Sequence, residues 1–367
     1  MKILELITFL ASGGAERFVV DLSNELAKNN EVCLMTILDD KKEAEHRNFY
    51  RFALSGSVKY TNLGLPNGLK YSSQMAVKRA IEKVNPDIVH IHLACTLNYS
   101  ALAVLSLAWK YKIFTTIHND IHNGYDCGLV KFLCNTYGRW GRFKVACLSE
   151  KNYRDFVECY PKTEGRCIVN GRAPIVPTGL FDNVKKEMAD FRSSASSRLF
   201  IHVARFNPQK NQNLLVGAFN ELVAEGRDVD LVVIGNGFDS AEGMLLQRKA
   251  CGNIHFIGTR KNISDYVLNA DIFCLSSDFE GMPISLLEAS LAGLPAVSTP
   301  VCGAVDLIKN GVNGYLSKDH SLEEYKAALI KAISDYDLLK SNAMKMKENS
   351  PYTIELCAKK YIDYFNS

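Results

Sequence analysis

The sequence predicts an α/β protein with two domains, each built on a doubly wound parallel sheet. A chain of 367 residues is long for a single hydrophobic core, so two domains are expected. Short apolar runs alternate with longer amphipathic stretches, which is the rhythm of strands and crossover helices. This rhythm stops once, at the proline- and glycine-containing stretch NGRAPIVPTGL, and then starts again. Each half is therefore expected to form a Rossmann-like domain.

The apolar runs place the strands in two series. The first series is expected at residues 2–8, 31–37, 58–64, 87–93, 112–118, 143–149 and 166–171, and the second at 199–204, 230–235, 253–258, 271–276 and 295–299. Amphipathic stretches such as AERFVVDLSNELAKN and SSQMAVKRAIEKVN lie between many of them and predict helices.

These series set the expected domain boundaries. An N-terminal domain is expected over residues 1–171, a linker region over 172–197 and a C-terminal domain over 198–350. A last helix within 351–367 is expected to pack back toward the N-terminal domain. The two domains are expected to face each other across a cleft.

Composition excludes several classes of protein. A formal net charge of +3 is too small for the concentrated basic face of a nucleic-acid-binding protein. The eleven cysteines include no Cys-x-x-Cys pair, which favours free thiols in a reducing compartment. The first residues resemble a secretory leader, but Glu5 interrupts a short apolar core, and no apolar run approaches 18 residues. A cytoplasmic protein is expected, and peripheral contact with the inner face of the cell membrane stays open.

Unusual side chains follow the strands of the second series. The carboxyl ends of parallel strands share one edge of the sheet, where ligands bind and helix N-termini point their amides. Four consecutive loops on this edge supply two cations, two glycines and two carboxylates: Arg205 and Lys210, Gly235 and Gly237, Glu280 and Glu288. The third loop, TRKNISDY, begins with Thr259. Each feature alone is common, but their convergence indicates a binding site.

The stretch EGMPISLLEASLAG predicts a helix that Pro283 begins and Gly293 ends. Glu288 then lies about 8 Å along the helix axis. A sugar nucleotide fits this helix start, with its pyrophosphate on the amides around Gly281 and Met282 and on the two cations. Glu288 would accept hydrogen bonds from the ribose hydroxyls, and Glu280 would reach the transferred sugar.

These residues resemble the retaining glycosyltransferase family 4, which has the GT-B fold. The resemblance covers nearly the whole chain, through SGGAERFV, PDIVHIH, TTIH, CIVNG, HVARFNPQKNQNLL, VVIGNGF, IHFIGTRKNI, EGMPISLLE and GLPAVSTPVCGAVDLIKNGVNGYL. The E-x7-E stretch combined with Arg-x4-Lys is specific. One departure is CIVNGRAP, where family members often place a hydrophobic residue and Asp after Asn-Gly.

The resemblance implies roles for individual residues. Arg205 and Lys210 match the pair that neutralises the donor diphosphate, Glu280 the residue at the donor sugar and Glu288 the one at the ribose. Further residues match other parts of the family's site: Gly13 and Gly14 the N-domain loop beside the diphosphate, His118 a sugar contact, and Thr259, Gly281, Met282, Pro283 and Ile284 donor contacts beside Gly235 and Gly237.

The implied reaction is transfer of a sugar, with retention of configuration, from a nucleoside-diphosphate sugar to a saccharide or lipid-linked saccharide. A UDP-sugar is the favoured donor, and cell-surface polysaccharide or glycolipid synthesis the favoured role. No cofactor, metal ion or nucleic-acid partner is expected. The Asp-x-Asp at Asp228–Asp230 precedes its strand and so lies away from the proposed site. His90 and His92 share a strand face but have no third metal ligand in view.

Residues 131–144, KFLCNTYGRWGRFK, interleave cations with aromatic side chains. Such a stretch either docks on an anionic membrane or forms a surface helix packed by its aromatics.

Other activities also stay open. A sugar-nucleotide epimerase would share the architecture without needing the E-x7-E and Arg-x4-Lys combination, and an inactive glycan- or protein-binding protein would have no need of the charged site residues. An NAD-dependent oxidoreductase would need a G-x-G-x-x-G after the first strand, which is missing.

Overall fold

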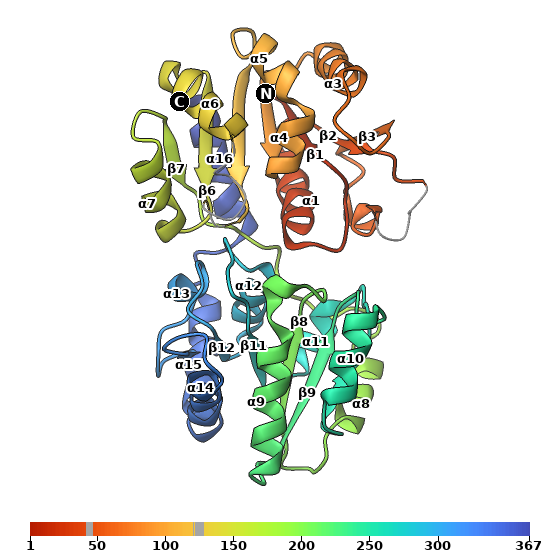
Figure 1. Ribbon diagram of the computed structural model, residues 1–367, viewed down its shortest axis with the longest axis vertical. Helices are drawn as coiled ribbons and strands as arrows, with labels where there is room; N and C mark the ends of the chain where they lie inside the picture. The colour runs from red at the N-terminus through yellow and green to blue at the C-terminus, as the bar shows by residue number, and fades with distance from the viewer. Residues whose placement is uncertain (42–46, 120, 122–127) are drawn as a thin grey trace. The chain divides into compact units, whose positions relative to one another are not determined.

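The protein, seen in a computed structural model, divides into two compact units (Figure 1). The structure describes residues 1–41, 47–119, 121 and 128–367. The first unit comprises Met1–Ala173 and Tyr352–Ser367, and the second comprises Pro174–Pro351.

Within the described residues, the first unit contains a seven-stranded parallel sheet in the order β3-β2-β1-β4-β5-β6-β7. Its strands are β1 (Lys2–Ile7), β2 (Glu31–Leu38), β3 (Lys59–Leu65), β4 (Ile88–His92), β5 (Lys112–Ile117), β6 (Phe143–Cys147) and β7 (Gly165–Cys167). The strand order reverses between β1 and β4, as in Rossmann folds. The predicted doubly wound parallel sheet is confirmed.

Helices cover both faces of this sheet. They are α1 (Gly14–Leu26), α3 (Tyr71–Val84), α4 (Ala94–Tyr99), α5 (Ala101–Leu107), α6 (Gly128–Thr136), α7 (Glu150–Cys159) and α16 (Ile354–Asn366), with short 3₁₀ turns η1 (Arg51–Ala53) and η3 (Gly138–Trp140). Leu4 and Leu6 point into a core that includes Val77 of α3. Because side chains alternate along a strand, Glu5 points to the opposite face, where α1 and α16 pack against each other.

The C-terminal helix α16 completes the first unit. Tyr361, Tyr364 and Phe365 are fully buried, and the Tyr364 hydroxyl donates to the carbonyl of Val145 in β6 at 3.2 Å. The Phe365 ring lies 4.8 Å from the ring of Phe114 in β5, centroid to centroid. Helix α16 therefore supplies core side chains that the sheet of the first unit needs.

In the second unit, the described residues form a six-stranded parallel sheet in the order β10-β9-β8-β11-β12-β13. Its strands are β8 (Arg198–Val203), β9 (Val229–Ile234), β10 (Ile254–Phe256), β11 (Ile272–Leu275), β12 (Ala296–Ser298) and β13 (Gly314–Leu316). Its helices are α8 (Phe181–Asp190), α9 (Gln212–Ala224), α10 (Ala241–Lys249), α11 (Ile263–Leu268), α12 (Ile284–Ala292), α13 (Ala304–Leu307), α14 (Leu322–Ser334) and α15 (Tyr336–Glu348), with the 3₁₀ turn η4 (Pro208–Lys210). The order again reverses between β8 and β11, so the second predicted sheet is confirmed.

The structure differs from the expected linker over residues 172–197. Most of this segment belongs to the second unit, because α8 buries Val184 and Met188. The backbone N–H of Thr178 also donates to the Asp265 carboxylate of α11 at 2.7 Å. The prolines that interrupt the strand rhythm thus lead into a packed helix.

No helix within the described residues combines the length and the apolar character that crossing a bilayer requires.

The buried face of α16 predicts a large effect of Phe365→Ala. Removing this ring leaves a cavity against Phe114 and His90 and is expected to lower the free energy of unfolding of the first unit by about 3–5 kcal/mol. Urea unfolding monitored by circular dichroism measures this free energy. Leu356→Ala, on the 45% exposed side of the same helix, is the control and should change stability little. Equal effects of the two substitutions would contradict the packing of α16.

Candidate active site

The second sheet brings two loops together at its switch point. The loop after β8, residues 204–211, and the loop after β11, residues 276–283, both leave the carboxyl edge of the sheet from adjacent strands. The N–H of Asp278 donates to the carbonyl of Gln209 at 2.8 Å, and the Ser276 hydroxyl donates to the carbonyl of Lys210 at 2.8 Å. Ligands of doubly wound sheets bind at such a switch point, which makes this edge the candidate site.

Lys210 and Glu280 form an ion pair across these loops. The Lys210 ammonium lies 2.5 Å from Glu280 Oε1, and the Ser277 hydroxyl donates to the same oxygen at 2.7 Å. The Glu280 side chain is 7% exposed, whereas that of Lys210 is 18% exposed. A buried carboxylate needs such partners to stay charged. An ammonium has three donors, and among the residues that the structure describes Glu280 is the one side chain that pairs with Lys210.

Helix α12 follows Glu280 directly. It begins at Ile284, with Pro283 as the N-cap one residue before the helical turn, and ends at Gly293, whose φ of 73° is left-handed. The predicted glycine stop is confirmed, and the start lies one residue later than predicted. Glu288 lies within the helix and is 9% exposed.

Gly303 and Thr299 pack closely against the loop that precedes α12. A Cβ on Gly303, whose φ is +71°, would lie 2.8 Å from the Cα of Met282. The Thr299 hydroxyl donates to the carbonyl of Ser277 at 2.6 Å. The amides of Gly281 and Met282 therefore sit on a tightly packed loop at the start of the helix.

The other predicted donor-binding residues of this unit line neighbouring loops. A Cβ on Gly235 would meet the carbonyl oxygen of Ala204 at 2.0 Å, so packing between the β8 and β9 loops already requires this glycine. Gly237 has a φ of +86°, which favours glycine. Thr259 is exposed on the loop after β10, and Gly235 is tied to that loop by a hydrogen bond from its N–H to the carbonyl of Gly258 at 3.1 Å.

Arg205 is exposed on the same loop as Lys210. Its carbonyl accepts a hydrogen bond from the Gln212 amide at 2.9 Å, which fixes the backbone. In the part of the chain that the structure describes, no carboxylate lies within ion-pair distance of its guanidinium. The structure thus joins Lys210 to Glu280 and leaves Arg205 facing solvent beside them.

Gly13, Gly14 and His118 belong to the first unit. Gly13 is the N-cap of α1, and a Cβ there would lie 2.2 Å from the carboxylate oxygen of Glu16 in the first helical turn. Gly14 is exposed. Both glycines follow β1, next to the switch point of the first sheet.

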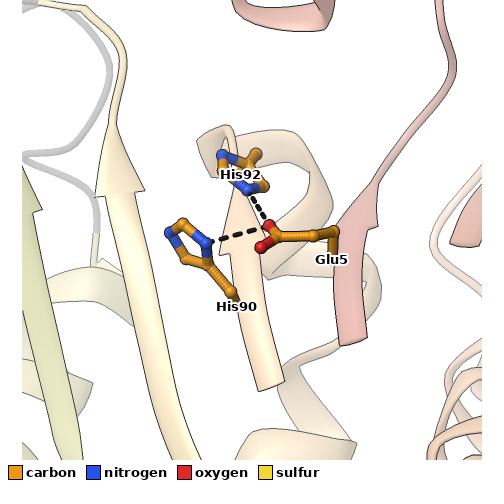
Figure 2. Close-up of side chains that lie close together, drawn as sticks. All are labelled: Glu5, His90 and His92. Atoms are coloured by element: carbon orange, nitrogen blue, oxygen red, sulfur yellow. Dashed lines mark hydrogen bonds and ion pairs between the residues drawn. The ribbon is translucent and has the colours of Figure 1, made fainter. Parts of the chain in front are cut away.

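His118 directly follows β5 and is linked to two other buried side chains. Its Nε2 lies 3.0 Å from Nδ1 of His92, whose Nε2 lies 2.6 Å from Oε2 of Glu5. His90 Nδ1 lies 2.9 Å from the same oxygen. Figure 2 shows the Glu5 carboxylate of β1 pointing toward both histidines of β4. The sequence features alone did not join Glu5 to His92 and His118.

This environment changes the acidity of its members. Burial raises the pKa of the Glu5 carboxyl, but the interactions with His90 and His92 together outweigh burial and lower that pKa to about 2. Burial, helped by His90, lowers the pKa of His92 to about 4. Burial and the neighbouring His92 and His90 hold the pKa of His118 well below its ordinary value. At neutral pH a charged carboxylate therefore faces neutral His92, which is linked to neutral His118.

Glu5, His90 and His92 are also the one trio of potential metal ligands close enough to share an ion among the described residues. The sequence pattern places no third ligand beside the histidine pair, whereas the fold brings Glu5 next to it. The 2.6 Å separation of His92 Nε2 from Glu5 Oε2 is, however, a direct hydrogen-bond distance. We therefore assign Glu5 and His92 as a hydrogen-bonded pair, with His90 Nδ1 in close contact with the same carboxylate oxygen.

The Asp-x-Asp residues have other partners at the amino edge of the second sheet. Asp228 accepts a hydrogen bond from the Ser196 hydroxyl at 2.7 Å, and Asp230 accepts one from the N–H of Ser193 at 2.7 Å. Both carboxylates flank the start of β9, away from the loops that carry Lys210 and Glu280.

Comparison with known proteins gives the class of the chain. Residues 12–172 match the model of Glycosyltransferase Family 4, and residues 183–351 match that of Glycosyl transferases group 1. Anabaena HepE, solved in complex with UDP and glucose, is similar over 100% of this chain and 99% of its own, with a TM-score of 0.78 and 17% identity. The fold is therefore that of the GT-B glycosyltransferases.

Two relatives in sequence support the assignment of the chain to a glycosyltransferase family. The putative glycosyltransferase EpsF of Bacillus subtilis is 34% identical over 81% of this chain and 78% of its own length. The O-antigen biosynthesis glycosyltransferase WbnH of Escherichia coli is 23% identical over 97% of this chain and 96% of its own. The chain belongs to glycosyltransferase family 4.

The buried cluster predicts loss of stability in acid. His92 is neutral when folded until about pH 4 but takes up a proton near pH 6.5 when unfolded, so its contribution is complete above about 6.5 and is lost as the pH falls toward 4. The contribution of Glu5 is present above about 4.5 and is lost as the pH falls toward 2. We expect His92→Gln to be less stable at pH 7 and to have a shallower pH dependence between 6.5 and 4.

Urea unfolding at pH intervals measures this dependence. Trp109 and Trp140 are the two tryptophans of the chain and both lie in the first unit, so their fluorescence reports on that unit. A pH dependence as steep in the variant as in the natural protein would exclude His92 as its source.

Proposed function

We propose that the protein transfers a sugar from a UDP-sugar to a saccharide or lipid-linked saccharide, with retention of configuration and without a metal ion, in the synthesis of a cell-surface polysaccharide or glycolipid. The observation that carries this proposal is the Lys210–Glu280 pair at the switch point, directly before helix α12. Membership of family 4, the UDP and glucose bound by HepE, and the O-antigen role of WbnH support it.

In this proposal the second unit stabilises the leaving diphosphate. Negative charge develops on the diphosphate as the bond to the sugar breaks. Lys210 offers the ammonium donors that Glu280 does not occupy within the described residues, Arg205 offers an exposed guanidinium, and the start of α12 offers backbone amides at Gly281 and Met282. These groups supply positive charge without a metal ion, while the Asp-x-Asp carboxylates bind serine groups at the other edge.

The remaining residues position the donor. Lys210 and Ser277 hold Glu280 through Oε1, and the Gln209 amide makes a long contact of 3.5 Å to Oε2. In this proposal Oε2 accepts a hydrogen bond from a hydroxyl of the transferred sugar. Glu288 accepts the ribose hydroxyls, and His118 contacts the sugar. The acceptor hydroxyl attacks from the face that the diphosphate leaves, and a donor phosphate oxygen takes its proton. Transfer of this kind needs no second carboxylate across the bond, unlike glycoside hydrolysis.

Lys210→Met is expected to lower the release of nucleoside diphosphate from a UDP-sugar by orders of magnitude, because stabilisation of the leaving group is lost. It also leaves the buried Glu280 without its counter-ion, at a cost of about 3 kcal/mol in stability. The double variant Lys210→Met/Glu280→Gln removes both charges. We expect it to regain stability and to stay inactive.

Diphosphate release with a panel of nucleotide sugars, and urea unfolding by circular dichroism, measure the two effects. Lys249→Ala, at an exposed lysine of α10, is the control. If the double variant regained both stability and diphosphate release, Lys210 would have a structural role only. A folded natural protein that releases no diphosphate from any donor would favour the glycan- or protein-binding alternative, and a sugar nucleotide isomerised without release would favour an epimerase.

We further propose that the first unit docks on an anionic membrane to reach a lipid-linked acceptor. Three aromatic side chains are exposed: Phe132 at 51%, Trp140 at 71% and Trp109 at 63%. The Arg142 guanidinium lies 4.7 Å from the centre of the Trp109 ring. Lys131 and Arg139 are exposed as well. We call these six residues the aromatic-basic surface, which combines interfacial rings with cations that attract anionic lipid.

Both tryptophans lie in this surface, so their emission is expected to shift to shorter wavelength when vesicles containing phosphatidylglycerol are added at low salt. The shift should weaken in high salt and in Arg139→Glu/Arg142→Glu, because the attraction is electrostatic. Arg248→Glu/Lys249→Glu, at two exposed cations of α10, is the charge-matched control. Absence of any shift at low salt would exclude docking through these residues.

A further inference from the structure

In the chain of hydrogen bonds that links Glu5, His92 and His118, the donor and the acceptor of each bond are fixed. A carboxylate can only accept hydrogen bonds, so the proton between Glu5 Oε2 and His92 Nε2, 2.6 Å apart, belongs to His92. A neutral imidazole has a single N–H, so His92 Nδ1 is an acceptor. The hydrogen bond of 3.0 Å between His92 Nδ1 and His118 Nε2 must then be donated by His118. A neutral His118 consequently has no proton on Nδ1.

The fold fixes this chain of hydrogen bonds. Glu5, His92 and His118 come from β1, β4 and the end of β5, which are neighbouring strands. The ring of Phe18 in α1 lies edge-on to both histidines, 5.7 Å from His118 and 6.3 Å from His92 between centroids. Glu5 and His92 are fully buried, whereas His118 is 8% exposed. Only the last member can therefore meet a substrate.

We propose that Glu5 and His92 are positioning residues that hold His118 in the tautomer protonated on Nε2, so that Nδ1 accepts a hydrogen bond from a hydroxyl of the donor sugar. This inference rests on the proposed function for its substrate, but the tautomer belongs to the free protein. An acceptor at this position favours sugars with a hydroxyl there and disfavours keto or deoxy analogues, which leave it without a donor.

A second branch offers an internal control. His90 Nε2 lies 2.7 Å from the Thr116 hydroxyl, which lies 2.9 Å from the hydroxyl of Tyr361 in α16. This branch shares Glu5 with the first through the contact to His90 Nδ1 but does not include His118. Thr116→Val breaks this branch and leaves the path from Glu5 to His118 intact.

Long-range proton–nitrogen NMR of the full chain labelled with ¹⁵N-histidine tests the inference without substrate. His118→Gln assigns the signal by its loss. In the natural protein we expect His118 to be protonated on Nε2 and unprotonated on Nδ1 from about pH 6 to 8. Protonation on Nδ1 would overturn the inference. So would one equivalent of tightly bound metal in the purified protein whose removal by a chelator changes the His118 signal.

Glu5→Gln removes the obligatory acceptor, since a side-chain amide can also donate. We expect a folded Glu5→Gln to populate the other His118 tautomer and to lose roughly tenfold or more in kcat/KM for the donor. Thr116→Val should keep the His118 signal of the natural protein. An unchanged His118 tautomer in Glu5→Gln would overturn the inference. If Glu5→Gln does not fold, the spectrum of the natural protein decides alone. Failure of the proposed function would appear separately, as no diphosphate release by a natural protein with the expected tautomer.

Discussion

The parallel pairing of strands is the constraint on which both candidate sites depend. In each unit the strand order reverses once, and the loops on either side of the reversal leave the same edge of the sheet. Lys210 and Glu280 are 70 residues apart in the chain, yet β8 and β11 are neighbours, so the two side chains form an ion pair. Glu5 and His92 are 87 residues apart and meet for the same reason, through β1 and β4.

The two units stabilise a buried carboxylate in different ways. Glu280 pairs with a lysine ammonium, which has three donors, so a diphosphate could share that cation without leaving Glu280 unpaired. Glu5 has neutral His92 as its hydrogen-bond donor deep in a sheet, where neither partner can exchange for a ligand. The first arrangement suits a group that takes part in charge development during transfer. The second suits a group that fixes the orientation of another side chain.

Much of the fold could be predicted from the sequence because apolar runs mark buried parallel strands directly. The strand β13, Gly314–Leu316, was missed because it is short and glycine-rich, and α8 was missed because prolines precede it. Lys210 and Glu280 were predicted because loop residues beyond strand ends can be read in order. In the sequence, Glu5 stands out only as a charge in a leader-like stretch. Its partners depend on strand register, which no local pattern contains.

The two edges of the first sheet separate the proposed membrane-docking surface from His118. Trp109 and Trp140 precede β5 and β6, whereas His118 follows β5, so the aromatic-basic surface and His118 lie at opposite ends of the strands. A strand of six residues spans about 20 Å. A lipid-linked acceptor docked at this surface would have to extend by about that length to bring its terminal hydroxyl to the carboxyl edge. Acceptors that already carry sugars beyond the lipid headgroup meet this requirement, as in the later additions to a growing saccharide.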